Sequence, residues 1–518
     1  MPLEANTLIH DTNSINTTSH NGNIVFIKKL WKKIIKIKFN YLQISLFVNF
    51  LLFFLIGFLI IAFYNNNKQY WKEEALKLKE YDLTFSNVSY YSPIVQKNIP
   101  PLWRHPIVSN VNCSRLLNGD KMYIENEYKN LKKLKYLQNT FSTSCEYIKK
   151  RGYYPDQPLS EEESNFPIAY IRTIYTDYLT IEYQFLLTYA PQNHYCFVVD
   201  KKQKGDFHSK IFALSNCFPN IHLITNRYDM DSNGFNINLA NYDCMKYLSK
   251  KNFKYLIILN NDDMPLKTNK ELVEILKTFN GTIDAEYIQD PSYYSETRVN
   301  LKLNWTLGHL ELFKKGDQRN LNKKILSSSL SFQKGMVQIS YPKETIEYLV
   351  NELNLTKYLN QLNDMKLFAS DELSFQTLIA NKYLNIPGRV DIECIQKDNL
   401  FQKSYMTRYT KWNINKTCDD DIVRHYICLQ NVKTLQKLKN MPHFFINKFK
   451  SETDIGGLTC WAEYLYNRTY FQPYVPIKKT FYENLATVQY KNLSPQIKDK
   501  EKLCNMSKRM NSSYNIEY

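Results

Sequence analysis

The sequence predicts an α/β protein with a largely parallel β-sheet. Short apolar runs, rich in β-branched and aromatic residues, recur through the middle of the chain and are typical of strands buried on both faces. They lie at residues 166–175, 194–200, 220–225 and 253–260. Helix-like segments separate them, including residues 180–190 and 238–250. Strands that alternate with helices indicate βαβ units and therefore parallel pairing.

Size and composition indicate a mostly globular protein. The chain has 518 residues, with 13 glycines and 40 tyrosines, which excludes a collagen-like chain and one too poor in aromatic residues to fold. Lys and Arg exceed Asp and Glu by 17. Such an excess favours polyanion or phosphate partners, although a lysine-rich solvated surface is the more usual cause.

One apolar segment decides the predicted topology. Residues 44–64 form a run of 21 residues without a charge, long enough to span a bilayer core of about 30 Å. The run is too long for a cleaved signal peptide, and no small-residue cleavage site follows it. A lysine cluster directly before it should stay in the cytoplasm, which sends the C-terminal part across the membrane. These lysines are Lys28, Lys29, Lys32, Lys33, Lys36 and Lys38. The sequence therefore predicts a type II membrane protein with a signal-anchor helix.

Shifts in composition divide the chain into five regions. The predicted stem is polar and then broken by prolines, and the chain becomes polar again after the globular domain. The regions are a cytoplasmic tail 1–43, a transmembrane segment 44–64, a stem 65–110, a globular domain 111–474 and a C-terminal tail 475–518.

Cysteines and glycosylation sequons fit a non-cytosolic domain. All ten cysteines follow the apolar segment, and an even number in such a compartment favours disulfides. The sequence has no Cys-x-x-Cys pair and no histidine spacing typical of zinc sites, which disfavours a metal cluster. Ten Asn-x-Ser/Thr sequons also lie beyond the segment and support exposure to the glycosylation machinery.

Acidic residues follow two of the predicted strands. Ligands of open α/β sheets bind outside the carboxyl ends of the strands, where Asp200, Asp262 and Asp263 stand. Each acid can accept hydrogen bonds from a nucleotide, or can simply cap a helix or occupy a turn. The literal Asp-x-Asp of Asp229 and Asp231 invites a metal-nucleotide interpretation, but its distance from the preceding apolar run favours a turn or helix start. No glycine-rich phosphate loop is present.

Another pair of acids lies at a predicted helix start, in "LFASDELSFQTLI", residues 367–379. Ser370 is a natural N-cap, and Asp371 and Glu372 then occupy the first turn, where acids complement the helix dipole by about 0.3–1 kcal/mol. The pattern alone favours a structural role for both acids.

Five segments, read in order, resemble successive blocks of the core-2/I-branching β-1,6-N-acetylglucosaminyltransferases. They are residues 166–202, 253–276, 370–379, 407–413 and 444–450, and the similarity covers roughly residues 113–460. Members of this family are Golgi type II proteins with a GT-A-type, Rossmann-like α/β fold, which agrees with the topology derived above. The resemblance makes residues 111–474 a lumenal catalytic domain.

The resemblance implies an inverting glycosyltransferase that needs no metal and no cofactor. The acceptor hydroxyl must lose its proton as it attacks, so a general base is required. The departing UDP gathers negative charge, which fixed cations can stabilise. The resemblance assigns the base to Glu372 and the cations to Arg424 and Lys448, whose side chains suit phosphate contacts.

Further residues match positions on the donor and acceptor sides of the family. On the donor side these residues are Tyr175, Asp200 and Asp263, and relatives often have histidine in place of Tyr175. On the acceptor side they are Glu286, Arg298 and Trp412. Met336 replaces a small residue and Ile414 an aromatic one, so the acceptor specificity is not transferable. The implied disulfides are Cys113–Cys460, Cys145–Cys217, Cys196–Cys244 and Cys418–Cys428, with Cys394 and Cys504 unassigned.

The resulting hypothesis is a Golgi enzyme that transfers N-acetylglucosamine from UDP-GlcNAc to galactose or N-acetylgalactosamine of an O-glycan, forming a β-1,6 branch. A xylosyltransferase-like donor preference, a non-catalytic membrane-anchored glycan-binding protein of the same fold and a membrane-anchored structural protein are the alternatives. The predicted partners are the nucleotide sugar, a glycan or glycoprotein and the membrane, but no nucleic-acid polymer. The oligomeric state is left open.

Overall fold

The computed structural model describes residues 99–134, 141–288, 297–497, 499 and 503–505. The predicted cytoplasmic tail, the transmembrane segment 44–64 and the stem up to residue 98 lie outside these residues. Within the described ranges, no helix is long and apolar enough to cross a membrane.

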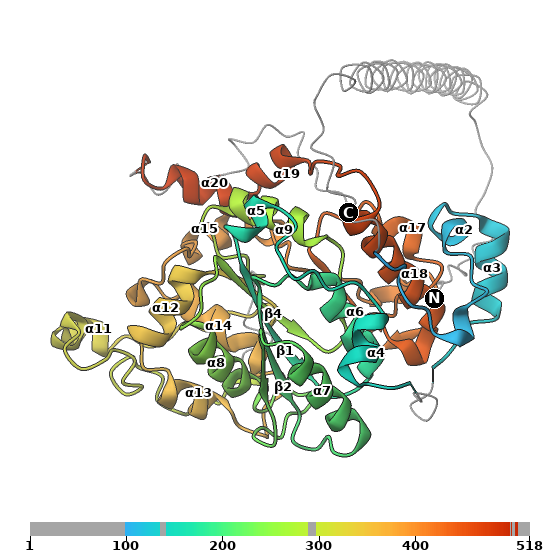
Figure 1. Ribbon diagram of the computed structural model, residues 1–518. Helices are drawn as coiled ribbons and strands as arrows, with labels where there is room; N and C mark the ends of the chain where they lie inside the picture. Colours follow the sequence, from blue (N-terminus) through green and yellow to red (C-terminus); the bar gives the residue numbers. More distant parts are fainter. Residues whose placement is uncertain (1–98, 135–140, 289–296, 498, 500–502, 506–518) are drawn as a thin grey trace, which may run out of the picture. The chain divides into compact units, whose positions relative to one another are not determined.

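A five-stranded sheet forms the centre of the structure, in the order β3-β2-β1-β4-β6 (Figure 1). Four strands are parallel, and β6 at the edge is antiparallel to β4. The strands are β1 (Ile168–Ile174), β2 (His194–Val199), β3 (Ile221–Ile224), β4 (Tyr255–Asn260) and β6 (Ser340–Pro342). The four apolar runs in the sequence are the four parallel strands, so the prediction of an α/β fold with a mostly parallel sheet is confirmed.

Alternating side chains of β1 enter two separate hydrophobic cores. Ile168 and Tyr170 belong to one core, and Ala169 and Ile171 belong to the other. Successive side chains of a strand point to opposite faces, so each core lies on one face of the sheet. Both faces are therefore covered by helices, which explains why the strands read as continuous apolar runs.

Different helices build the two cores (Figure 1). The first core contains residues of α6 (Tyr178–Thr188), α7 (Asp206–Cys217), α9 (Asn269–Phe279) and α18 (Ser451–Tyr470). The second contains residues of α8 (Ile237–Leu248), α12 (Lys343–Asn351), α13 (Thr356–Leu362) and α14 (Asp371–Ala380). Helices α6 and α8 correspond to the two helix-like segments in the sequence.

The remaining helices are short. They are η2 (Pro106–Val108), α2 (Cys113–Leu117), α3 (Lys121–Lys129), α4 (Cys145–Lys150), α5 (Glu161–Ser164), η4 (Gln318–Leu321), α11 (Lys323–Leu326), η5 (Lys382–Leu384), α15 (Ile392–Lys397), α16 (Leu400–Lys403), η6 (Ile414–Lys416), α17 (Leu435–Leu438), α19 (Lys479–Glu483) and α20 (Ala486–Leu493).

Two small sheets bring distant segments of the chain to the carboxyl edge of the central sheet. In the first, β10 (Phe445–Asn447) pairs antiparallel with β5 (Asp263–Pro265) and parallel with β7 (Arg408–Thr410). The second is the hairpin of β8 (Val423–Arg424) and β9 (Ile427–Cys428). Because β5 follows β4 almost directly, β7 and β10 lie next to the carboxyl end of β4.

The packed structure extends beyond the predicted domain limits at both ends. In the predicted stem, Leu102 and Val108 are buried in the first core. In the predicted C-terminal tail, Tyr482, Leu485 and Val488 are buried in the same core. Residues 479–493 therefore pack as helices on the domain and are not merely appended to it.

All ten cysteines form disulfides. The four pairs implied by the resemblance are present: Cys113–Cys460, Cys145–Cys217, Cys196–Cys244 and Cys418–Cys428. The fifth pair joins the two cysteines that the resemblance leaves unassigned, Cys394 and Cys504.

Candidate active site at the carboxyl edge of the sheet

The ends of β1, β2 and β4 place their following residues side by side. Ile174 is paired with Val199, and Thr173 is paired with Asn260. Tyr175 directly follows β1, and its backbone N–H donates to Oδ1 of Asn261 at 2.8 Å. This edge is where open α/β sheets bind their ligands.

Tyr175 offers an aromatic surface at this edge. The residue is 37% exposed, and the ammonium of Lys450 lies 5.9 Å from the centre of its ring. Burial of the hydroxyl group and the neighbouring charge of Asp262 raise the pKa of Tyr175, which keeps it a neutral hydrogen-bond donor. Its position fits the donor contact that the resemblance implies.

Asp200, at the end of β2, is buried and held by protein groups. Its Oδ1 accepts the backbone N–H of Lys202 at 3.0 Å and that of Met230 at 3.4 Å. The ammonium of Lys202 lies 3.2 Å from Oδ2 and also contacts Asp229. A uridine group that contacted Asp200 would share it with this lysine.

The literal Asp-x-Asp has a structural role at both acids. Asp229 pairs with Lys202, and Oδ1 of Asp231 accepts the backbone N–H groups of Asn233 and Phe235 at 2.9 and 3.1 Å. This pattern stabilises a turn, as the sequence favours. No group of three or more His, Cys, Asp or Glu residues in the described part of the chain is arranged to hold a metal ion.

A chain of alternating charges extends from β10 to the β8–β9 hairpin. The ammonium of Lys448 lies 3.8 Å from Oδ2 of Asp262, and that of Lys450 lies 3.5 Å from Oδ1. Lys450 is also 3.5 Å from Oε1 of Glu452, which Arg424 contacts at 3.0 Å. We call these five residues, with three cations and two anions, the charge chain.

The cations of the charge chain differ in exposure. The side chains of Lys448 and Lys450 are 12% and 1% exposed, whereas that of Arg424 is 42% exposed. Burial lowers the pKa of the Lys448 ammonium, and the neighbouring charge of Asp262 opposes this shift. Lys448 and Arg424 are thus linked through Asp262, Lys450 and Glu452, and Lys450 lies against the ring of Tyr175.

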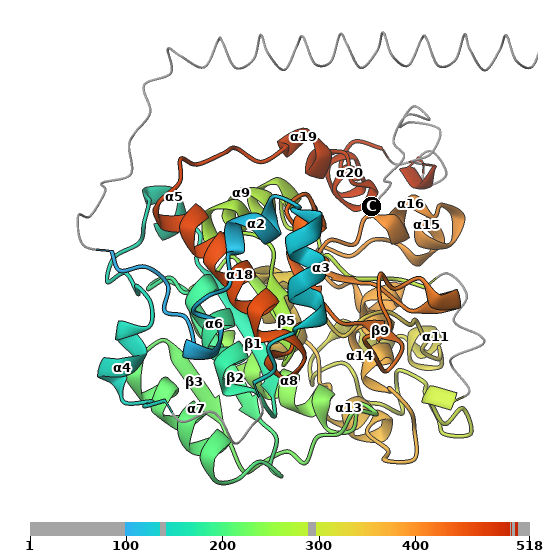
Figure 2. The ribbon, with the colours of Figure 1, turned by 90° about the vertical axis from the view of Figure 1, so that its right-hand side faces the viewer.

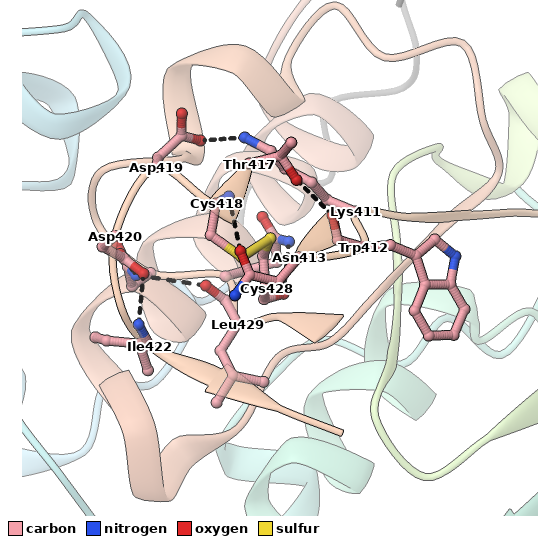
Figure 3. The surroundings of a disulfide bond; sticks show 12 residues. Lys411, Trp412, Asn413, Thr417, Cys418, Asp419, Asp420, Ile422, Cys428 and Leu429 are labelled. Atoms are coloured by element: carbon pink, nitrogen blue, oxygen red, sulfur yellow. Dashed lines mark hydrogen bonds and ion pairs between the residues drawn. A yellow bond between two sulfur atoms is a disulfide. The ribbon is translucent and has the colours of Figure 1, made fainter. Parts of the chain in front are cut away.

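The Cys418–Cys428 disulfide holds the base of the hairpin that carries Arg424 (Figure 3). At the tip, His425 and Tyr426 adopt positive φ angles of 51° and 61°, which closes a tight turn directly after Arg424. Trp412 lies close to the same disulfide. Its backbone forms an isolated β-bridge with Ile427, and the residue is 38% exposed. Figure 3 shows the indole pointing away from the disulfide.

Glu372 lies in the first turn of α14 and is held by two cations. Its Oε2 accepts a hydrogen bond from Nη1 of Arg298 at 2.7 Å, and the ammonium of Lys334 lies 3.2 Å away. The side chain remains 22% exposed. Ser370 takes the N-cap position with helical dihedral angles, and its side chain makes no capping hydrogen bond, so the predicted capping role of Ser370 is wrong.

Asp371 has a different environment from Glu372. It is buried, and burial together with the neighbouring charge of Glu372 raises the pKa of its carboxyl to about 7. A Cβ atom on Gly234 would lie 2.2 Å from Oδ1 of Asp371, so a glycine is required opposite this carboxyl. Asp371 is thus a structural helix-start acid, as the sequence favours, and only Glu372 faces the site.

Glu286 joins the Glu372 side of the site. Burial raises the pKa of Glu286, the charges of Lys334 and Arg408 oppose this shift, and the charge of Glu372 adds to it. A Cβ atom on Gly335 would lie 1.8 Å from the backbone oxygen of Glu286. The backbone at residue 335 therefore passes directly against Glu286, and the structure brings Glu286, Arg298 and Glu372 together.

Arg408 lies between the two halves of the site. Its charge acts on both Glu286 and Lys448, and its Nη1 is 3.4 Å from Oδ1 of Asp263. Asp263 is fully buried, and its carboxylate also accepts hydrogen bonds from the Asn447 side chain at 2.8 Å and the Asn260 backbone at 2.6 Å. The donor contact that the resemblance implies for Asp263 is therefore not available in this structure, where Asp263 instead orients Arg408.

Three cations of the site are not singled out by any sequence pattern: Lys334, Arg408 and Lys450. Two of them lie inside segments that carry the family resemblance, Arg408 in "TRYTKWN" and Lys450 in "FFINKFK". Lys334 lies outside those segments. Only the spatial approach of Lys334 to Glu372 identifies it, because the two residues are far apart in the sequence.

The chain is similar in sequence to known glycosyltransferases. The chain is 26% identical to a beta-1,3-galactosyl-O-glycosyl-glycoprotein beta-1,6-N-acetylglucosaminyltransferase of Bos taurus, over 69% of this chain and 85% of the bovine protein. It is 27% identical to an N-acetyllactosaminide beta-1,6-N-acetylglucosaminyl-transferase of Mus musculus, over 65% of this chain and 82% of the mouse protein. Residues 168–439 match the profile of the Core-2/I-branching enzymes, and the chain belongs to this family of glycosyltransferases.

Proposed function

We propose that the protein transfers N-acetylglucosamine from UDP-GlcNAc to a hydroxyl group of galactose or N-acetylgalactosamine in an O-glycan. The product is a β-1,6 branch, formed with inversion at the anomeric carbon. The observation that carries the proposal is the partly exposed Glu372 carboxylate, held by Arg298 and Lys334 at 2.7 and 3.2 Å. The names of the relatives supply the sugar, the linkage and the acceptor class.

Glu372 acts as the general base in this proposal. Its carboxylate takes the proton of the acceptor hydroxyl while the hydroxyl oxygen attacks the anomeric carbon. The bond from that carbon to the UDP oxygen breaks, and the diphosphate leaves with the electron pair. Attack from the face opposite to the leaving group inverts the configuration. A positioned base contributes about 10²–10⁴-fold to such a rate.

The charge chain supplies the counter-charge for the departing UDP. Arg424 is the exposed cation of the charge chain and can form bidentate contacts with phosphate, and Lys448 provides a compact charge. The diphosphate would replace Glu452 as the partner of Arg424, since both are anions that need the same guanidinium group. Fixed cations take the place of a divalent metal, and we propose that the transfer is metal-independent.

The cellular setting follows from the sequence and is part of the proposal. The charge-free run 44–64 and the lysines before it favour a single-pass type II protein of the Golgi membrane. The catalytic domain would then lie in the lumen, where its glycan acceptors and an oxidising environment suited to five disulfides occur.

A transfer assay on the purified full-length chain in detergent tests the function. We expect transfer from UDP-GlcNAc to a core-1 O-glycan acceptor, unchanged by EDTA, and slower or absent transfer from UDP-xylose. Glu372→Gln should lower kcat by about 10²–10⁴-fold. Glu347→Gln, on helix α12 and partly exposed, is the matched control and should behave like the parent.

Three outcomes would contradict parts of the proposal. Donor binding without turnover would favour the non-catalytic glycan-binding alternative. Loss of activity in EDTA would contradict metal independence. Parent-like turnover by Glu372→Gln would exclude Glu372 as the base.

A further inference from the structure

Lys334 is a buried lysine that the sequence does not mark as part of the site. Its side chain is 11% exposed, and its ammonium lies 3.2 Å from Oε2 of Glu372. Taking a lysine out of water is costly unless an anion compensates the charge. The carboxylate of Glu372 is such an anion, although Arg298 already pairs with the same oxygen atom.

Backbone hydrogen bonds fix where Lys334 stands. Its carbonyl oxygen accepts the backbone N–H of Ile288 at 2.9 Å and the side-chain amide of Gln333 at 2.9 Å. The next backbone N–H, that of Gly335, donates to the carbonyl oxygen of Glu372 at 3.0 Å. The backbone segment of Lys334 is thus attached to the same residue that its ammonium group contacts.

The close approach at Gly335 ties Lys334 to Glu286 as well. A Cβ atom at position 335 would lie 1.8 Å from the backbone oxygen of Glu286, so residues 334–335 run directly between Glu286 and Glu372. The charge of Lys334 acts on the Glu286 carboxyl. Lys334 therefore lies between the proposed base and an acid on the proposed acceptor side.

We propose that Lys334 is a positioning residue that sets the orientation of the base Glu372. The inference rests on the proposed transfer function. Together with Arg298, the lysine holds Oε2 of the carboxylate and so prevents the carboxylate from rotating away from the acceptor hydroxyl. Positioning of this kind matters because a displacement of about 1 Å of a reacting group can cost about 10²-fold in rate.

Charged groups on several elements surround the Glu372 carboxylate. The groups that contact it or act on its immediate neighbours are Arg298, Lys334, Asp371, Glu286 and Arg408. Removing Lys334 leaves Arg298 as the cation in direct contact with Glu372, so the carboxylate loses one of the two groups that orient it.

The test compares kcat and KM of the full-length parent with those of Lys334→Met and Lys334→Gln. We expect kcat to fall about tenfold or more. The KM for UDP-GlcNAc should stay at the parent value, because the donor cations are other residues. Lys334→Arg should restore most of kcat.

A matched control and a stability measurement separate positioning from folding. Lys302→Met removes a lysine from an exposed position and should leave kcat and KM unchanged. If Lys334→Met or Lys334→Gln loses thermal stability but keeps the parent kcat, Lys334 is only structural and the inference is overturned. If the parent itself transfers no sugar, the proposed function fails and the inference fails with it. An active parent with unaffected Lys334 variants contradicts the inference alone.

Discussion

Asp371 and Glu372 are adjacent acids whose surroundings assign them different roles. Glu372 keeps 22% of its side chain exposed and contacts Arg298 and Lys334. Asp371 is buried against Gly234, and its Oδ1 accepts the backbone N–H of Glu372 at 3.1 Å. A base must reach the acceptor proton, and of the two acids it is Glu372 that has a partly exposed side chain with cations to orient it.

Asp371→Asn tests the buried acid through the pH dependence of stability. The pKa of Asp371 is raised from 3.8 to about 7 in the folded protein, so the folded state binds the proton more tightly than the unfolded state. The parent should lose stability as the pH rises from about 4 to about 7, and the loss should level off above that range. Asparagine does not titrate, so the variant lacks this loss. Between about pH 4 and about pH 7, the free energy of unfolding of the variant should therefore rise by about 2–4 kcal/mol relative to that of the parent.

Thermal unfolding of parent and variant at several pH values measures the difference. Asp317→Asn is a control of opposite sign, since its hydrogen bond to Arg319 lowers the pKa of Asp317, and this variant should lose most stability at neutral pH. Parallel curves for the parent and Asp371→Asn would contradict the assignment.

How far the sequence predicts a residue's role depends on how local its environment is. The role of Asp371 as a helix-start acid is predictable from its position in the chain. The contact between Lys334 and Glu372 is not, because it depends on how residues 333–336 run against α14. Asp263 shows the converse: its place after β4 is predictable, but its complete burial depends on Asn447 and Arg408, which later segments supply.

At the scale of elements, the apolar strands of the central sheet were the predictable part of the fold. β1, β2 and β4 carry buried apolar runs because both faces of the sheet are covered. β3, at the edge of the sheet, is a shorter apolar strand that is only half-buried. β5, β7 and β10 have three residues each, which is too short for a periodic pattern. Their pairing is non-local, with Ile446 opposite both Met264 and Tyr409, so the position of Arg408 emerges only from the folded structure.

The β8–β9 hairpin is the element that positions Arg424, the exposed cation of the proposed donor site. Its disulfide closes a loop of sequence separation 10, so its removal should lower global stability less than removal of a bridge over a long loop. It should affect donor binding more, because Arg424 lies within the closed loop. We expect the double variant Cys418→Ser, Cys428→Ser to raise the KM for UDP-GlcNAc about tenfold, comparable to loss of one charged hydrogen bond.

Arg424→Gln serves as the reference for this element. If the disulfide acts through Arg424, a variant that combines Arg424→Gln with the loss of the disulfide should show a smaller increase in KM than the product of the increases that each change causes alone. An unchanged KM in the disulfide variant would show that the hairpin keeps its geometry without the bridge.

At the scale of the whole described structure, the N-terminal segment is attached to α18 by three kinds of contact. Arg104 pairs with Glu463 at 2.6 Å, the hydroxyl of Tyr466 donates to the carbonyl of Pro100 at 2.8 Å, and the Cys113–Cys460 disulfide joins α2 to α18. Figure 2 shows α2 and α3 beside α18. Since α18 packs on α6 in the first core, the N-terminal segment is fastened to the face of the sheet.

Removal of the Cys113–Cys460 disulfide should therefore produce the opposite result to removal of the hairpin disulfide. The bridge spans 347 residues, and a cross-link over a long loop restricts the unfolded chain more than one over a short loop. We expect Cys113→Ser, Cys460→Ser to lower stability by about 2–5 kcal/mol, measured by thermal unfolding after non-reducing peptide mapping has verified the remaining pairs. Neither cysteine contacts the charge chain or Glu372 in the described structure, so the KM for UDP-GlcNAc should match the parent's below the unfolding transition. Equal losses of stability in the two double variants would contradict this prediction, because the Cys113–Cys460 disulfide would then stabilise the fold no more than the hairpin disulfide does.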